Sequence, residues 1–241
     1  MMPDQFPLFA KEGAKATITL NRPEHHNRID PDDIPKIHAH LDLVESDHSI
    51  QVLVITGTGH KTFSSGYTID AILTRMDDSF QILLSRIEKF SLVTICALNG
   101  SAYGGGVDLA TCCDFRIGVH GSRMFIPAAK FGLHYYPDGI RRFVQKVGSV
   151  AAKKIFMLSK TMDANEMLRV GFLNELVSQE ALYQSVDDYY KSILECDSSV
   201  STSMKKNIDA FASGDLSSEV WIQKYREALN SREMARRLGK D

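Results

Sequence analysis

The sequence predicts an α/β fold in which strands and helices alternate and the strands pair in parallel. Short, continuously apolar runs of strand length recur in the first half, and segments with helical spacing separate them. Parallel neighbours need a crossover connection, which a helix usually provides. The length of 241 residues, with 44% hydrophobic and 24% charged residues, fits a single α/β domain of repeated units.

The elements of the first half follow from this alternation. One helix carries Ile34, Ile37 and Leu41, which share a face at helical spacing. The apolar strand that precedes Gly57 ends at the glycines that follow it. The expected strands are 16–20, 51–56, 92–98 and 115–119, and the expected helices are 31–45, 79–90 and 105–113, with a further amphipathic run at 69–76.

After Pro137 the pattern becomes helical. The expected helices are 139–147, 150–158, 164–170, 182–194, 203–211 and 217–238, and a polar linker is expected at 197–203. We therefore divide the chain into a core at 1–195 and a C-terminal helical subdomain at 196–241. The apolar stripe from Val220 to Met234 is too extensive for a free helix, so the chain itself or a neighbour must cover it.

The most informative segment is a glycine-rich turn between a strand and a helix, NGSAYGGGVDL at 99–109. Its consecutive glycines, Gly104, Gly105 and Gly106, remove every Cβ, so another group can approach the backbone. The helix that follows presents N–H groups and positive dipole density, which suit an oxyanion or a phosphate. A tight packing turn would need the same glycines, so this run alone does not identify a site.

A carboxylate and a second turn strengthen the functional interpretation. Asp108 lies three residues after Gly105, on the same face of the predicted helix. The segment FSSGYTID at 63–70 again follows a strand and precedes a helical pattern, and its small residues leave a backbone N–H accessible. Two such turns can supply two N–H donors to one oxygen, which is the arrangement of an oxyanion hole.

These segments resemble the signature motifs of the crotonase (enoyl-CoA hydratase/isomerase) superfamily. That family has F-[SAC]-[AS]-G-x-D and N-G-x-[AC]-x-G-G-G-x-[ED]-L, and its opening motif L-N-R-P-x-x-x-N occurs here at 20–27. Three ordered motifs make the resemblance specific, and it covers essentially the whole chain. It implies a crotonase-like spiral of ββα units and a coenzyme A thioester as substrate, with no other cofactor. It also implies a homotrimer or a dimer of trimers, in which the C-terminal helices close the site and form subunit contacts.

The resemblance further implies a set of site residues. The N–H groups of Ser65 and Gly105 would form the oxyanion hole, and Asp108 would stand where family hydratases have their first catalytic glutamate. Such a site stabilises a thioester enolate, and the loss of one donor typically costs about 3–4 kcal/mol. Expected contacts to substrate or coenzyme A are Phe63, Ser64, Gly66, Tyr67, Gly104, Tyr136 and Asp138.

The second catalytic glutamate of the family is missing. It belongs to a motif P-E-x-x-x-G-[LI], whereas this chain has PAAKFGL, so Ala128 occupies the position. Alanine cannot transfer a proton, which argues against hydration or isomerisation by the usual pair of glutamates. We expect Asp108 and Tyr135 to be the catalytic residues, with Tyr136 as the alternative to Tyr135.

The next segment, GLHYYPDGI, is similar to the methylmalonyl-CoA decarboxylase branch, which also lacks the second glutamate and has a tyrosine at Tyr135. Decarboxylation needs an oxyanion hole and an oriented carboxylate more than it needs a base. Against this assignment, that branch has a histidine at Tyr67. The aspartate of the family motif is Thr68 here, so the contacts on the adenine side of coenzyme A are expected to differ.

Charged residues of this segment have alternative interpretations. Asp138 either caps the helix that follows or takes part in the site. We expect His134 to be a surface residue, and Arg141 and Arg142 to be solvated charges or ion-pair partners rather than coenzyme A ligands.

Composition excludes other classes. A net charge of -2 gives no reason to expect binding to nucleic acid or membranes, and the sequence shows neither a signal-peptide core nor a transmembrane segment. The cysteines lack the spacing of a metal site or a disulfide framework, so a cytoplasmic protein without a metal is expected. They are Cys96, Cys112, Cys113 and Cys196.

Two classes of function remain open. One is a lyase or isomerase of fatty acid metabolism that acts on an acyl-CoA through an enolate, as a hydratase, isomerase or decarboxylase. The other is a non-catalytic homologue that binds acyl-CoA or a protein partner. The glycine turn, both donor positions and Asp108 favour the enzyme.

Overall fold

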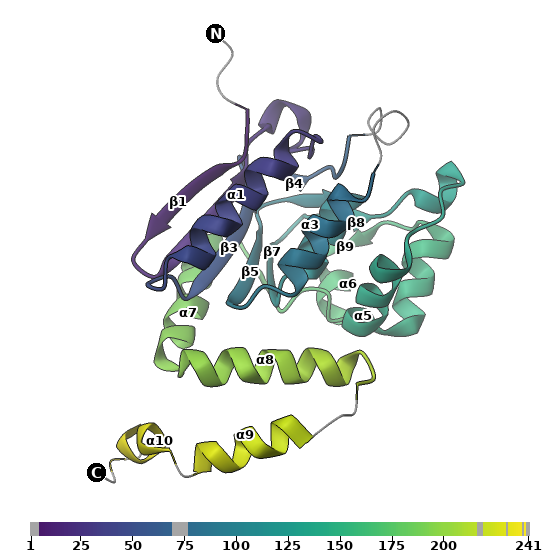
Figure 1. The fold of residues 1–241 in the computed structure, drawn as a ribbon. Coiled ribbons are helices and arrows are strands. Elements are labelled where there is room, and N and C mark those ends of the chain that lie inside the picture. Colours follow the sequence, from purple (N-terminus) through teal and green to yellow (C-terminus); the bar gives the residue numbers. More distant parts are fainter. Residues whose placement is uncertain (1–4, 69–76, 216–218, 230, 238, 240–241) are drawn as a thin grey trace. The chain divides into compact units, whose positions relative to one another are not determined.

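The computed structural model describes residues 5–68, 77–215, 219–229, 231–237 and 239 (Figure 1). The chain divides into two compact units, one ending at Ser198 and the other beginning at Ser199. The first unit contains both sheets and the predicted site. The second consists of helices, and the boundary expected from the sequence lies slightly before this division.

The main sheet has six strands in the order β1-β2-β3-β5-β7-β10. Only β1 is antiparallel to its neighbour, and the other pairs are parallel, as the alternation of strands and helices predicts. The strands are β1 (Leu8–Glu12), β2 (Lys15–Leu20), β3 (Val52–Gly57), β5 (Val93–Leu98), β7 (Phe115–Val119) and β10 (Glu175–Val177).

A smaller sheet has the order β4-β6-β8-β9, and its strands are β4 (Thr62–Ser64), β6 (Ser101–Tyr103), β8 (Arg123–Phe125) and β9 (Met162–Asp163). Strands β4, β6 and β8 each follow closely on a strand of the main sheet, and a helix then follows β6. The chain therefore repeats a unit of two strands, one in each sheet. This arrangement confirms the predicted α/β fold and the spiral of ββα units.

The central strand β3 explains how helices cover both faces of the main sheet. Its side chains alternate, so Val52 and Val54 join the cluster that contains Leu182 on α7, while Leu53 and Ile55 join the main core. Figure 1 shows α1 and α3 in front of this sheet. The helices of the first unit are α1 (Asp33–Ser46), α3 (Ser79–Glu88), α4 (Gly105–Cys112), α5 (Pro137–Leu158), α6 (Ala164–Arg169) and α7 (Leu182–Glu195).

The predicted helix boundaries are mostly within two residues of those observed. The two helices expected at 139–147 and 150–158 lie within α5, and Gly148, with φ of 76°, breaks the helical conformation between them. Strands β4, β6 and β8 were not predicted, because three residues are too few to show a period. The amphipathic run at 69–76 lies outside the described residues.

The C-terminal unit differs from the expectation in two places. The expected polar linker at 197–203 is mostly helical, because α8 (Ser198–Ala212) begins there. The expected single helix at 217–238 is divided into α9 (Glu219–Leu229) and α10 (Arg232–Arg237). Serine residues suit the first turn of a helix as well as a linker, so composition alone misassigned the segment.

Substitution of Leu83 by alanine should destabilise the core. Leu83 is 0% exposed on α3, whereas the adjacent Ile82 is 59% exposed. We expect Leu83→Ala to lower the free energy of unfolding by about 2–5 kcal/mol. The control Ile82→Ala should change it by about 0.5 kcal/mol or less. Equal losses in urea denaturation would contradict the placement of this helix.

Candidate active site

Two backbone turns meet at the start of α4. Gly104 adopts φ 50° and ψ −122°, and the helix begins at the next residue, Gly105. A Cβ on Gly106 would lie 2.6 Å from the carbonyl oxygen of Ser64, and a Cβ on Gly66 would lie 2.6 Å from the Gly105 nitrogen. Real side chains do not make such contacts, so glycine is required at both places for the two motifs to meet.

The Ser65 amide is directed away from this meeting point. Its N–H donates a hydrogen bond of 2.8 Å to the carbonyl of His26, in the loop formed by the L-N-R-P-x-x-x-N motif. The structure therefore contradicts the expectation that the Ser65 N–H belongs to the oxyanion hole. The Ser65 N–H instead holds the turn to the loop of the opening motif, a role that the sequence does not reveal because it does not show the direction of each amide.

The amide of Tyr67 lies beside Gly105. Tyr67 forms a parallel bridge with Ile29, in which the Ile29 N–H donates to the Gly66 carbonyl at 2.8 Å and the Thr68 N–H donates to the Ile29 carbonyl at 3.1 Å. Because N–H groups alternate in direction along an extended chain, the Tyr67 N–H is directed away from Ile29. A Cβ on Gly105 would lie 3.2 Å from the Tyr67 nitrogen.

Asn27 fixes the loop that supports this turn. Its side chain is 1% exposed, and its amide donates to the carbonyls of Thr58 at 2.9 Å and Thr62 at 2.8 Å. The side-chain oxygen accepts from the Arg22 N–H at 3.1 Å, and the Asn27 carbonyl accepts from the Ser64 hydroxyl at 2.8 Å. Asn27 of the opening motif thus joins three segments behind the turn.

Asp108 lies in the first turn of α4 and has no exposed surface. Its Oδ2 accepts a hydrogen bond of 3.0 Å from the Tyr135 hydroxyl and a second one from the Tyr136 hydroxyl. Its Oδ1 lies 3.3 Å from Nη1 of Arg142. The predicted catalytic residues Asp108 and Tyr135 are therefore in direct contact, and Tyr136 shares the same carboxylate oxygen.

Burial raises the pKa of the Asp108 carboxyl, while the Arg142 cation and the two phenolic donors oppose this effect. Burial also raises the pKa of Tyr135 and of Tyr136, and the negative charge of Asp108 raises both further. Both phenols consequently remain protonated near neutral pH and act as donors toward the carboxylate.

Arg142 is the main charged partner of this carboxylate, and it is 0% exposed. Its Nη1 donates to the Tyr136 oxygen at 2.8 Å, and its Nε lies 3.0 Å from Oε2 of Glu88. Burial lowers the pKa of the guanidinium, but the surrounding anionic groups outweigh it and the net shift is upward. The expectation of a solvated charge is wrong for Arg142, whereas that of an ion-pair partner is confirmed.

Other predicted site residues occupy different environments. Phe63 is wholly buried in the main core. Ser64 is also buried, and its hydroxyl donates to the Asn27 carbonyl. Asp138 is exposed, pairs with Arg141 at 3.4 Å and lies inside the first turn of α5, so it does not cap that helix. His134 is exposed, as expected.

Ala128, at the position of the absent glutamate, is buried in the core. The side chains that sequence analysis did not assign to the site are Arg142 and Glu88, which lie on different helices. No local signal identifies them, because an Arg-Arg pair and a helix-ending glutamate are common on protein surfaces.

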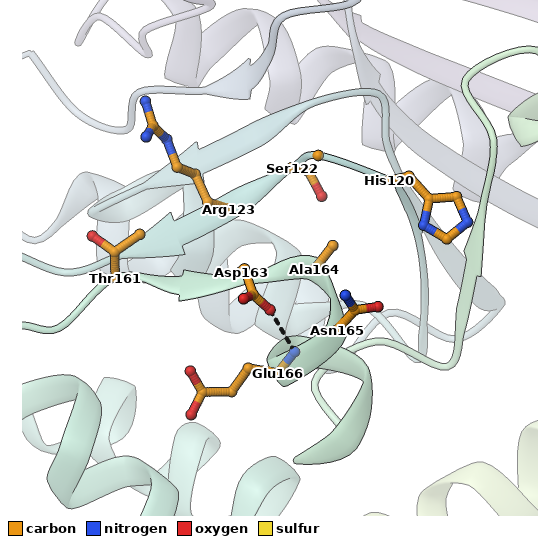
Figure 2. Close-up of a pocket in the computed structure, with 9 residues that line it drawn as sticks. His120, Ser122, Arg123, Thr161, Asp163, Ala164, Asn165 and Glu166 are labelled. Atoms are coloured by element: carbon orange, nitrogen blue, oxygen red, sulfur yellow. Dashed lines mark hydrogen bonds between the residues drawn. The ribbon is translucent and has the colours of Figure 1, made fainter.

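A separate polar pocket of about 420 Å³ lies beside β8, β9 and the start of α6 (Figure 2). It is lined by residues that include Arg123, Asp163 and Glu166, and the Asp163 carboxylate accepts the Glu166 N–H at 2.8 Å as a helix cap. None of the predicted site residues lines it. Among the residues that the structure describes, no cluster of His, Cys, Asp and Glu could hold a metal ion, and no helix is long and apolar enough to cross a membrane.

Residues 10–229 match the sequence model of the enoyl-CoA hydratase/isomerase family. The chain is 31% identical over 186 residues to the crotonyl-CoA hydratase of Syntrophomonas wolfei, which covers 74% of this chain and 72% of that protein. It is also 30% identical over 192 residues to the carnitinyl-CoA dehydratase of Citrobacter koseri. That alignment covers 77% of this chain and 73% of the dehydratase. The chain therefore belongs to the enoyl-CoA hydratase/isomerase family, as its motifs indicate.

Solved structures with names of the same kind share the fold. The crystal structure of an enoyl-CoA hydratase/carnithine racemase from Magnetospirillum magneticum superimposes with a TM-score of 0.88. The superposition covers 97% of this chain and 91% of the chain from Magnetospirillum magneticum, and the two sequences are 24% identical. This similarity supports the crotonase fold.

Replacing Gly66 by alanine should separate the two turns. Gly66 has φ of 85° and Gly59 has φ of 83°, but no atom lies within 4 Å of a Cβ on Gly59. Gly59→Ala should cost about 1–2 kcal/mol of backbone strain. Gly66→Ala should cost a further ~1–3 kcal/mol, because its Cβ meets rigid backbone. Equal losses in chemical denaturation would show that the close approach is not required.

Proposed function

We propose that this protein is an acyl-CoA enzyme that holds the thioester oxygen of its substrate between the amides of Tyr67 and Gly105. The observation that carries the proposal is the approach of the Tyr67 nitrogen to Gly105 at the first residue of α4. The N–H groups of a first helical turn lack partners within the helix, and the helix dipole adds positive potential there. Both effects stabilise the oxyanion of an enolate.

Asp108 is the carboxylate that transfers protons in this proposal. It lies one helical turn beyond Gly105, and Ala128 supplies no second proton carrier. Hydratase and dehydratase names among the relatives favour chemistry of the enoyl-CoA hydratase/isomerase type. Because Asp108 acts without the usual second glutamate, one carboxylate and the hydroxyl of Tyr135 would have to serve both faces of the substrate.

Decarboxylation of the methylmalonyl-CoA type is the second candidate. The observation in its favour is that two phenols and a guanidinium already donate hydrogen bonds to the Asp108 carboxylate, which makes the carboxylate a weaker base. Decarboxylation needs no base, because loss of carbon dioxide itself leaves the enolate in the oxyanion hole. In this case Tyr135 would orient the departing carboxylate.

Self-assembly belongs to the same proposal. The C-terminal unit exposes apolar side chains on α8 and α9, and such faces are normally covered by another subunit. The exposed residues include Met204, Ile208, Val220, Tyr225 and Leu229. We propose a cytoplasmic homotrimer or dimer of trimers that acts in fatty acid metabolism.

Substitution of Gly105 by proline tests the oxyanion hole. Proline is tolerated at the first residue of a helix but lacks the N–H. We expect kcat/KM to fall by about a hundredfold or more, the effect of losing one oxyanion donor. Gly105→Ala keeps the N–H but adds a Cβ that would lie 2.9 Å from Cε1 of Phe80 and 3.2 Å from the Tyr67 nitrogen, so it measures the cost of the added carbon alone. Gly105→Pro should lose more activity than Gly105→Ala, and native activity in a Gly105→Pro protein that remains folded by circular dichroism would show that the amide is not the donor.

Asp108→Asn and Tyr135→Phe distinguish the two reactions. For hydration of crotonyl-CoA, Asp108→Asn should lower kcat by about 10²–10⁴, because an amide cannot accept the proton of water. For decarboxylation of a malonyl-type thioester, Tyr135→Phe should lower kcat more than Asp108→Asn does. Tyr136→Phe is the control, because it also removes one hydrogen-bond donor from Asp108 but leaves the Tyr135 hydroxyl in place.

Binding and turnover assays of the native protein distinguish an enzyme from a non-catalytic binding protein. Calorimetric binding of acyl-CoA without turnover of crotonyl, 3-enoyl or malonyl-type thioesters would favour the non-catalytic homologue. Failure to bind any of these thioesters would overturn the proposed function.

A further inference from the structure

A row of alternating charges runs from the surface of α5 to the buried carboxylate of Asp108. The Arg141 guanidinium lies 2.8 Å from Glu88, and Arg142 lies 3.0 Å from the same Glu88 oxygen. Arg142 then lies 3.3 Å from Asp108. The side chain of Arg141 is 36% exposed, whereas those of Arg142 and Asp108 are both 0% exposed. Solvent can therefore screen only the outer end of this row.

We propose that Arg142 is a positioning residue that keeps Asp108 ionised and oriented, and that Glu88 limits this effect by sharing the same guanidinium. The proposal rests on the proposed function for the role of Asp108 in the reaction. The contacts of Arg142 themselves do not depend on which acyl-CoA is the substrate.

The geometry gives Arg142 two routes to Asp108. Its Nη1 contacts Oδ1 of the carboxylate directly, and the same nitrogen donates to the Tyr136 oxygen at 2.8 Å. The Tyr136 hydroxyl in turn donates to Oδ2 of Asp108. The planar guanidinium thus contacts Glu88 through Nε while Nη1 contacts both Asp108 and Tyr136, and an ammonium group with a single nitrogen cannot reproduce this arrangement as well.

The remaining groups around Asp108 do not replace this cation. The neighbouring part of α5 and the loop before it contribute the neutral phenols Tyr135 and Tyr136, and α4 itself contributes the thiol of Cys112. Helix α3 contributes Glu88, which is an anion. On β4 and β6, the titratable residue is Tyr103, whose hydroxyl accepts from Arg123 at 3.3 Å. Arg142 is thus the cation in contact with Asp108 among the described residues.

Removal of the two charges should shift the ionisation of Asp108 in opposite directions. In Arg142→Met the Asp108 pKa should rise by about 1–3 units, because an opposite charge at this distance favours the anion by that amount. In Glu88→Gln it should fall, because a repelling anion is lost and Arg142 is no longer shared. The measurement is a ¹³C NMR titration of the aspartate side-chain carboxyls in the unliganded full-length protein. Asp108→Asn identifies the signal.

Kinetics provide the second measurement and the control. The acidic limb of the kcat/KM profile should move to higher pH in Arg142→Met and to lower pH in Glu88→Gln, with little change in the dissociation constant of the acyl-CoA. Arg141→Met, which removes a cation that contacts Glu88 and not Asp108, should shift the Asp108 titration less than Arg142→Met. If Arg142→Met does not fold, Arg142→Lys and Glu88→Gln are titrated instead. Arg142→Lys should keep the Asp108 pKa within a unit of the native value while kcat falls.

Shifts of the same sign in Glu88→Gln and Arg142→Met, or none in either, would overturn the role of Arg142. A native protein that neither binds nor converts an acyl-CoA would overturn the proposed function instead. The NMR titration would still report on Arg142 in that case, because it requires no substrate.

Discussion

The close approach of two backbone turns is the constraint on which the rest of the structure depends. A Cβ at Gly66 or Gly106 would lie 2.6 Å from backbone atoms of the opposite turn, so no side chain can stand between them. Each turn follows a strand of the smaller sheet, and these strands, β4 and β6, pair in parallel with a register shift at Thr62–Ser64. The sheet therefore brings the turns together, and glycine lets them close. The side chain of Asn27 then holds the segment that leads into the Gly66 turn, because it donates hydrogen bonds to the carbonyls of Thr58 and Thr62.

The second constraint is the cost of burying the Asp108 carboxylate. An unpaired buried carboxylate would take up a proton, whereas here two phenols and a guanidinium compensate its charge. This arrangement also explains the buried Arg142, which would itself be unfavourable without Asp108 and Glu88. Burial and pairing are thus mutually dependent, and the removal of one charge leaves the other exposed to the full desolvation penalty.

The fold could be predicted from the sequence to a greater extent than the site. The continuous apolar run of β3 and the helical spacing of apolar residues in α1 are clear signals, so the sequence predicts their positions within about two residues. The turn at Gly105 was recognisable because three glycines have a direct backbone consequence. The direction of the Ser65 amide was not, since it depends on the hydrogen bond to His26. Arg142 and Glu88 were missed because tertiary packing, and no local pattern, buries their charges.

The contacts of Asp108 indicate where a substrate would gain access to it. The carboxylate has no exposed surface, so a reacting group must displace one of its donors. Tyr136 is held from both sides, because it donates to Asp108 and accepts from Arg142. Tyr135 makes a single hydrogen bond of 3.0 Å to the carboxylate, and its ring stacks on Tyr136 and packs against Phe156. In the proposed mechanism, the smaller number of contacts would make the Tyr135 hydroxyl the donor that a substrate replaces at the lower cost, while Tyr136 and Arg142 would keep the carboxylate in place. The two adjacent tyrosines would then have different roles, one fixed within the charge network and one exchanged for the substrate.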